Sequence, residues 1–153
     1  MVLPLLSPVF QEGDTIPTKY TCQGQDISPP LVWREPAAGT QTFALILDDL
    51  DAPSGVFTHW ILFNIPSNSR ELPEAIPTQD QLASGALQGK NHFGKIGYGG
   101  PCPPLGRAHR YQFTLYALDS PLDLKAGASK KEVLDAMQRH ILAQGQLTGT
   151  YRR

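Results

Sequence analysis

Two aspartates and a histidine lie close together in the sequence and form a candidate charged site. Asp49 and Asp51 follow the apolar run 43–47, and His59 stands at the start of the next apolar run. A strand–turn–strand connection of this length brings its two ends together, so either carboxylate can reach the His59 ring. A carboxylate beside an imidazole stabilises the protonated ring, which predicts a cationic donor for an anion near neutral pH. The simpler alternative is a pair of turn-capping aspartates and a histidine at the edge of the core.

A second candidate site is the loop 97–106, which is rich in glycine and proline and leads into His109 and Tyr111. Proline has no N–H group, so the donors left in the middle of the loop include Gly100 and Cys102. Glycines let such a backbone approach a ligand closely and turn its N–H groups toward an anion. The loop lacks the Gly-Lys-Ser/Thr ending of a P-loop. A rigid connection between two strands is the alternative interpretation.

The same residues also allow two catalytic interpretations. Cys102 and His109 could act as a nucleophile and its base, and His59, His109 and Asp49 could hold a metal ion that activates water. Neither spacing matches a known catalytic pattern. We therefore expect binding without catalysis, with no cofactor and no metal. A small hydrolase or a metal-dependent enzyme is kept as the alternative function.

Three runs with the composition of strands are placed to present these residues. The runs 43–47 and 60–65 are continuously apolar, as in the core strands of a sandwich. In the run 111–117, apolar and polar residues alternate, so one face packs and the other is partly solvated. Segments rich in proline and glycine separate these runs at short intervals. This pattern predicts an all-β fold, an antiparallel β-sandwich with one or two short helices.

One helix is indicated late in the chain. Ser129 and Glu132 have the spacing of a capping box, in which each side chain satisfies a free backbone N–H group of the first turn. The apolar residues that follow at helical spacing are Val133, Leu134, Met137 and Ile141. Gly145 is a natural stop, so the pattern predicts a helix from 129 to about 145 that packs on a sheet.

The composition restricts the class of protein. A length of 153 residues fits one domain, 1–153. The formal net charge of -1 gives no overall field toward nucleic acid or an anionic membrane, so an anion site must be local. Pro4 and Pro8 interrupt an apolar N-terminal stretch that has no basic region. We therefore expect neither a signal peptide nor integral membrane association, and a cytoplasmic protein.

The two cysteines, Cys22 and Cys102, are too few and too far apart for a disulfide scaffold or a spaced zinc motif. Two free thiols in a reducing cytosol are the expected state. A single bridge between them is the alternative, and the sequence leaves it open.

Two ordered motifs resemble the signatures of the phosphatidylethanolamine-binding proteins. Residues 49–53 read Asp-Leu-Asp-Ala-Pro and precede His59, as in the first signature, whose second residue is usually proline. Residues 99–104 read Gly-Gly-Pro-Cys-Pro-Pro and precede the His-Arg-Tyr of 109–111, as in the second. Leu50 in place of the signature proline loses a fixed φ and regains an N–H group, so the presentation of Asp49 is left open.

The resemblance implies a Greek-key β-sandwich with a small anion pocket at one end. The positions that match the pocket of the family are Asp49, Asp51, His59, His109 and Tyr111, with the backbone around Gly100 and Cys102. The implied ligand is a phosphate-like anion: a phospholipid headgroup, a nucleotide or a phosphorylated partner. The resemblance also implies regulation of a kinase or another signalling protein, and dimerisation occurs in short members of the family.

Overall fold

The centre of the molecule is the strand β3 (Thr42–Asp49), which the computed structural model places between two long antiparallel neighbours. The structure describes residues 2–153. The other elements are β1 (Leu5–Leu6), η1 (Thr18–Tyr20), β2 (Leu31–Trp33), β4 (Phe57–Pro66), β5 (Glu71–Leu72), β6 (Leu87–Gln88), β7 (His109–Leu118), α1 (Lys130–Met137) and β8 (Ile141–Tyr151). Five strands form one sheet in the order β6-β4-β3-β7-β8, and three form a second in the order β1-β2-β5.

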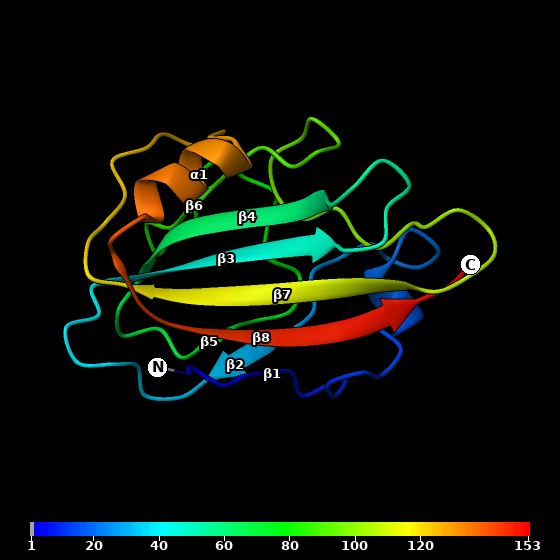
Figure 1. The fold of residues 1–153 in the computed structure, drawn as a ribbon, viewed down its shortest axis with the longest axis horizontal. Helices are drawn as coiled ribbons and strands as arrows, with labels where there is room; N and C mark the ends of the chain where they lie inside the picture. The colour runs from blue at the N-terminus through cyan, green and yellow to red at the C-terminus, as the bar shows by residue number, and fades with distance from the viewer. Residues whose placement is uncertain (1) are drawn as a thin grey trace.

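The continuous apolar runs of β3 and β4 are explained by burial on both faces of the large sheet. Phe43, Leu45 and Leu47 belong to the core between the two sheets. Ala44 and Ile46 belong to a second core beneath α1. Figure 1 shows this arrangement, with β4, β3, β7 and β8 side by side and α1 beside β4. The predicted sandwich with short helical elements is therefore confirmed.

The alternating run 111–117 lies in β7, as predicted. Its residues Tyr111, Phe113, Leu115 and Ala117 all point into the core between the sheets. After β3, β4 and β6 the chain returns, so that β7 pairs with the free side of β3. This spatial order, with the fourth strand beside the first, is that of a Greek key.

The helix is shorter than the sequence pattern predicted. The capping box of Ser129 and Glu132 is present, but α1 ends at Met137, and Arg139 adopts a left-handed φ of 69°. Ile141 and Gly145, predicted as a helical face and a helix stop, belong instead to β8. From Ala143 to Tyr151 every second residue of β8 is buried, which is the period of a strand.

Gly145 is required by a close approach of two backbones. The N-terminal segment lies along the edge of β8, where the Leu3 N–H donates to the carbonyl oxygen of Gln144 at 2.9 Å. A Cβ atom at Gly145 would lie 1.5 Å from the Leu3 carbonyl oxygen. Leu3 and Leu5 are both 2% exposed, so this segment completes the core between the sheets. Glycine at position 145 leaves room for the N-terminal segment to pack against the edge of β8.

We expect Gly145→Ala to lower the free energy of unfolding by about 2–3 kcal/mol, because the N-terminal segment must move and its leucines lose contacts. Urea denaturation measures this change. Gln144→Ala, at the exposed neighbouring position, is the control and should change stability by less than about 0.5 kcal/mol. Equal stabilities of the two variants would show that the segment docks without needing the glycine.

No helix in residues 2–153 has the length and hydropathy that crossing a bilayer requires.

Candidate anion-binding site

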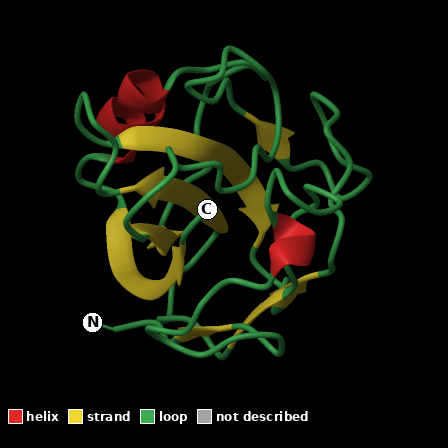
Figure 2. Ribbon diagram, turned by 90° about the vertical axis from the view of Figure 1, so that its right-hand side faces the viewer, coloured by secondary structure: helices red, strands yellow, loops and turns green. Residues whose placement is uncertain are grey.

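The predicted site residues cluster at one end of the large sheet. Asp49 ends β3 and lies opposite Phe57 of β4 and Tyr111 of β7. Residues two apart in a strand share a face, so His59 lies on the face of Phe57, and His109 on the face of Tyr111. The strand register therefore brings both histidines to the end of the sheet that Figure 2 views, surrounded by loops.

His59 is buried, with 3% of its surface exposed. Its Nδ1 atom lies 2.7 Å from the carbonyl oxygen of Gly99. Because a carbonyl oxygen only accepts, Nδ1 carries the hydrogen, and Nε2 is the ring nitrogen left for a ligand. Burial lowers the pKa of His59 below its ordinary value, although the Gly99 carbonyl and the Asp49 charge oppose this. The ring is thus neutral at pH 7 without a ligand, which differs from the predicted resting cation.

Asp49 contacts the other histidine. Its Oδ2 atom lies 2.8 Å from Nδ1 of His109, and its Oδ1 atom accepts the Asp51 N–H at 2.8 Å. The prediction that a carboxylate of this segment holds the His59 ring is therefore wrong, because β7 places His109 closer to the end of β3. The pair fixes the tautomer of His109 in the same way, with hydrogen on Nδ1 and Nε2 left for a ligand.

Asp51 has a structural role beside the site. It accepts hydrogen bonds from the Arg110 N–H and guanidinium at 2.8, 3.0 and 2.9 Å. The guanidinium lowers the pKa of Asp51 to about 2. Leu50 donates its N–H to the carbonyl oxygen of Arg110 at 2.9 Å. The departure from the signature proline thus adds a hydrogen bond between this turn and the start of β7, and this bond helps to position Asp49.

The Tyr111 ring packs beside both histidine rings. Its ring stands edge-on to His59 at 5.4 Å between centroids and stacks on His109 at 6.4 Å. The hydroxyl is buried and has no hydrogen-bond partner among residues 2–153. Burial, together with the nearby Asp49 charge, raises the pKa of Tyr111 well above its ordinary value. A buried, protonated and unpartnered hydroxyl is a donor that a ligand can satisfy.

The backbone donors of the loop are used differently from the prediction. Gly100 donates its N–H to Oδ1 of Asp26 at 2.8 Å, so it holds the loop in place instead of facing the histidines. Gly99 donates its N–H to the carbonyl oxygen of His59 at 3.0 Å. No backbone carbonyl of the described residues accepts the Cys102 N–H, which lies near the Tyr111 hydroxyl, and Cys102 lines the cavity between the histidines. Of the two predicted backbone donors, only Cys102 is placed to meet a ligand.

The two cysteines form a disulfide, so the prediction of free thiols is wrong. Cys22 and Cys102 are bonded with their Cα atoms 5.4 Å apart, across 80 residues of sequence. The bridge joins the segment around η1 to the site loop, where the Cys22 N–H also donates to the Pro101 carbonyl oxygen. With its sulfur in a disulfide, Cys102 is not a thiolate nucleophile.

The site is a small cavity of about 180 Å³ between the two histidines. Asp49, both histidines, Cys102 and apolar residues line it. Two of the apolar residues were not predicted, Phe57 and Phe93, whose rings stand edge-on to His59 at 5.3 and 5.1 Å. The cavity is smaller than the 300–1,000 Å³ or so that is usual for drug-sized ligands, and its size suits a small anion or headgroup. Within residues 2–153, no group of three or more His, Cys, Asp or Glu side chains is placed to hold a metal ion.

Comparisons with known proteins agree with this geometry. The family described as phosphatidylethanolamine-binding protein matches residues 6–152. A UPF0098 protein of Methanothermobacter thermautotrophicus is 51% identical over 149 residues, covering 97% of this chain and 98% of the relative. The chain therefore belongs to the phosphatidylethanolamine-binding protein family.

Two solved structures are also similar. A phosphatidylethanolamine-binding protein homologue of Chlamydia trachomatis, CT736, superposes with a TM-score of 0.91 at 39% identity, covering 99% of this chain and 98% of that one. YbcL of E. coli, described as a member of the mammalian family, gives a TM-score of 0.92 at 31% identity, covering 100% and 99%. Both comparisons extend over the whole domain.

Proposed function

We propose that this protein binds a small phosphate-like anion reversibly and without chemical change. The observation that carries the proposal is that both histidines line one small cavity and leave their Nε2 atoms without an internal partner. The buried Tyr111 hydroxyl, which lies beside both rings, also has no partner among the described residues, and each Nε2 becomes a donor when its ring is protonated. Charge-assisted hydrogen bonds from such groups are stronger than neutral ones and select an anion over a neutral ligand.

The neutral His59 ring must gain a positive charge when an anion binds. A neutral histidine with hydrogen on Nδ1 presents a lone pair at Nε2, which cannot donate to an anion. Each Nε2 becomes a donor only when its ring takes up a proton. A protonated His109 forms an ion pair with Asp49, which lies 2.8 Å away. Anion binding is therefore coupled to proton uptake by His59, whose pKa is lowered in the free protein.

We expect anion affinity to rise by tenfold or more between pH 8 and pH 6. The pKa of His59 in the free protein is below its ordinary value. At pH 8 part of the free energy of anion binding is therefore used to protonate the ring, and this part becomes smaller as the pH falls. Calorimetric titration with sulfate measures the effect, because sulfate itself does not titrate in this range. Tighter binding at pH 8 than at pH 6 would contradict the proposal.

His59→Asn is the matched variant for this experiment. The amide of asparagine can still donate to the Gly99 carbonyl oxygen, but it cannot take up a proton. The variant should bind sulfate more weakly at pH 6 and should lose part of the pH dependence. If it keeps the full pH dependence, the proton goes to a group other than His59.

The same pocket suits a phosphoryl group carried by a lipid headgroup, a nucleotide or a partner protein, and regulation of a kinase or another signalling protein belongs to this proposal.

We also propose that the site is not catalytic. Both oxygens of Asp49 accept internal hydrogen bonds, and the Cys102 sulfur is bonded to Cys22. The cytoplasmic location and a homodimer stay predictions, and a disulfide is more typical of oxidising compartments.

A further inference from the structure

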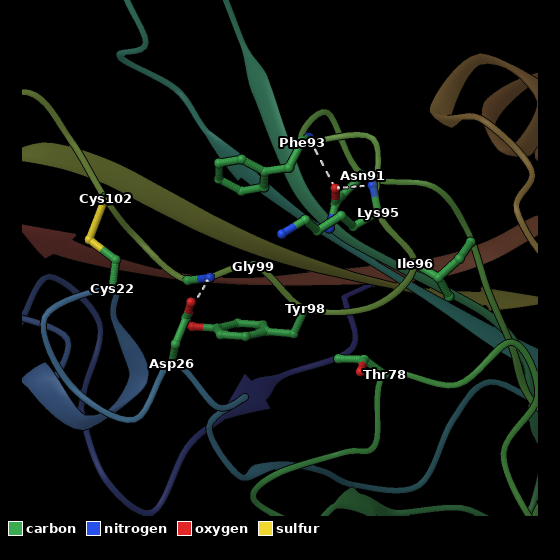
Figure 3. A pocket seen from close by; sticks show the side chains of 11 residues that line it. Cys22, Asp26, Thr78, Asn91, Phe93, Lys95, Ile96, Tyr98, Gly99 and Cys102 are labelled. Atoms are coloured by element: carbon green, nitrogen blue, oxygen red, sulfur yellow. Dashed lines mark hydrogen bonds between the residues drawn. A yellow bond between two sulfur atoms is a disulfide. The ribbon is translucent and has the colours of Figure 1, made fainter.

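A second cavity adjoins the anion site. It has a volume of about 340 Å³ and shares two wall residues, Phe93 and Cys102, with the small cavity. The Phe93 ring stands 5.1 Å from the His59 ring, so one aromatic ring separates the two spaces. Figure 3 shows Phe93 and Lys95 on one side of the second cavity and Asp26 and Tyr98 on the other. Phe93 and Cys102 form the wall between the two spaces, so a ligand that occupies both must displace the Phe93 ring.

Most polar groups of the second cavity are used internally. Asn91 donates to the Gly97 carbonyl oxygen and accepts the N–H groups of Phe93 and Lys95. The Tyr98 hydroxyl donates to the Tyr20 carbonyl oxygen at 2.6 Å. These groups form the wall and hold the loop, so they do not select the ligand.

Two opposite charges remain for a ligand. The lysine ion pairs among residues 2–153 involve Lys19, Lys130 and Lys131, and Lys95 takes part in none of them. Figure 3 shows the Lys95 side chain directed into the cavity. Asp26 uses Oδ1 to accept the Gly100 N–H, and its Oδ2 atom accepts no hydrogen bond from the described residues. The second cavity thus offers one ammonium and one carboxylate oxygen.

We propose that the second cavity binds the zwitterionic part of a phosphate ester, so that the ligand is an O-phosphorylated amino acid group of the phosphoserine type. The inference rests on the proposed anion site, which takes the phosphate. The ligand carboxylate pairs with Lys95, and its ammonium pairs with Asp26. In a phosphorylated peptide the same atoms are neutral amides, so the charge pattern favours the free amino acid or a serine headgroup over a phosphopeptide.

Calorimetric titration at pH 6 with inorganic phosphate, phosphoethanolamine and O-phospho-L-serine tests the proposal. We expect phosphoserine to bind about tenfold tighter than phosphate, and phosphoethanolamine to lie between them. Glycerophosphoserine separates the two sources: affinity equal to that of phosphoserine assigns a lipid headgroup, and weaker binding assigns the free monoester. A phosphoserine peptide with blocked termini should bind no tighter than phosphate, and tighter binding would overturn the proposal.

Two single-residue variants test whether Lys95 and Asp26 bind the charged groups of the ligand. Lys95→Met should reduce the affinity for phosphoserine to about that for phosphoethanolamine and leave the affinity for inorganic phosphate unchanged. Asp26→Asn keeps an acceptor for the Gly100 N–H and should weaken both amine-containing ligands. Lys90→Met, an exposed lysine outside the cavity, is the control and should change nothing.

The outcomes separate the inference from the proposed function. If phosphate binds but phosphoserine binds no tighter, or if Lys95→Met keeps the gain, the second subsite is wrong and the anion site stands. If none of the ligands binds at millimolar concentration, the anion site itself is wrong, and the inference falls with it.

Discussion

Removal of the Cys22–Cys102 disulfide is expected to lower the free energy of unfolding by about 4 kcal/mol. The bridge closes a loop with a sequence separation of 80 residues, and in the chain-entropy account a loop of this size constrains the unfolded state by about that amount. For a domain of this length the melting temperature should fall by roughly 10 °C. Both cysteines are exposed, so the bond is also accessible to a thiol reductant.

The double variant Cys22→Ser, Cys102→Ser isolates this effect. Its stability in urea should equal that of the wild type treated with excess dithiothreitol, and the reductant should not change the variant. The fold should survive, because hydrogen bonds from Tyr98 to Tyr20 and from Gly100 to Asp26 still join the two segments. A loss of less than about 1 kcal/mol would show that the bridge does little to restrict the unfolded chain.

The sequence predicts the strands well where burial makes the pattern strong. The runs 43–47 and 60–65 are apolar at every position because the large sheet is covered on both faces, by the second sheet and by α1. The alternation in 111–117 follows from one face in the core between the sheets. The clustering of His59, His109 and Tyr111 follows as well, because these residues come from motifs at the ends of these strands.

The features that the sequence did not predict correctly have a common physical cause. Gly145 looks like a helix stop in the sequence, but it is explained by the Leu3 backbone, which comes from the far end of the chain. The disulfide and the Asp26–Gly100 hydrogen bond likewise join segments that are distant in sequence. Phe93 reaches His59 through a loop whose path is set by the hydrogen bonds of Asn91. Local patterns carry no information about such contacts.

The choice of acidic partner for each histidine illustrates the same limit. Proximity in sequence favours Asp49 with His59, which lies in the next strand of the hairpin. The sheet register instead places Asp49 opposite Tyr111 of β7, two residues from His109, and the pair forms across the β3–β7 interface. The consequence is chemical as well as structural, since His109 has an anionic partner and His59 has a neutral carbonyl oxygen.

His109→Ala is expected to destabilise the protein by about 3 kcal/mol and to abolish measurable anion binding. Asp49 is 4% exposed, and removal of its partner leaves a buried carboxylate with one remaining backbone N–H donor, from Asp51. Breaking a buried pair from one side is costly for this reason. The double variant Asp49→Asn, His109→Ala removes the unpaired charge as well and should recover at least about 1 kcal/mol of the loss.

The chain contains a matched control for this experiment. His140 and Asp119 form a pair with the same atoms at 2.7 Å, but both side chains are 43% exposed, against 5% and 6% for His109 and Asp49. His140→Ala should therefore cost less than about 1 kcal/mol in urea denaturation and leave sulfate binding intact, because exposed pairs are screened by water. If the two histidine variants lose equal stability, burial of the Asp49 charge does not govern the site. If only His109→Ala is strongly destabilised and the Asn double variant recovers stability without recovering sulfate binding, the pair has two separable roles: His109 neutralises a buried carboxylate in the folded protein, and its Nε2 atom is the donor that the anion requires.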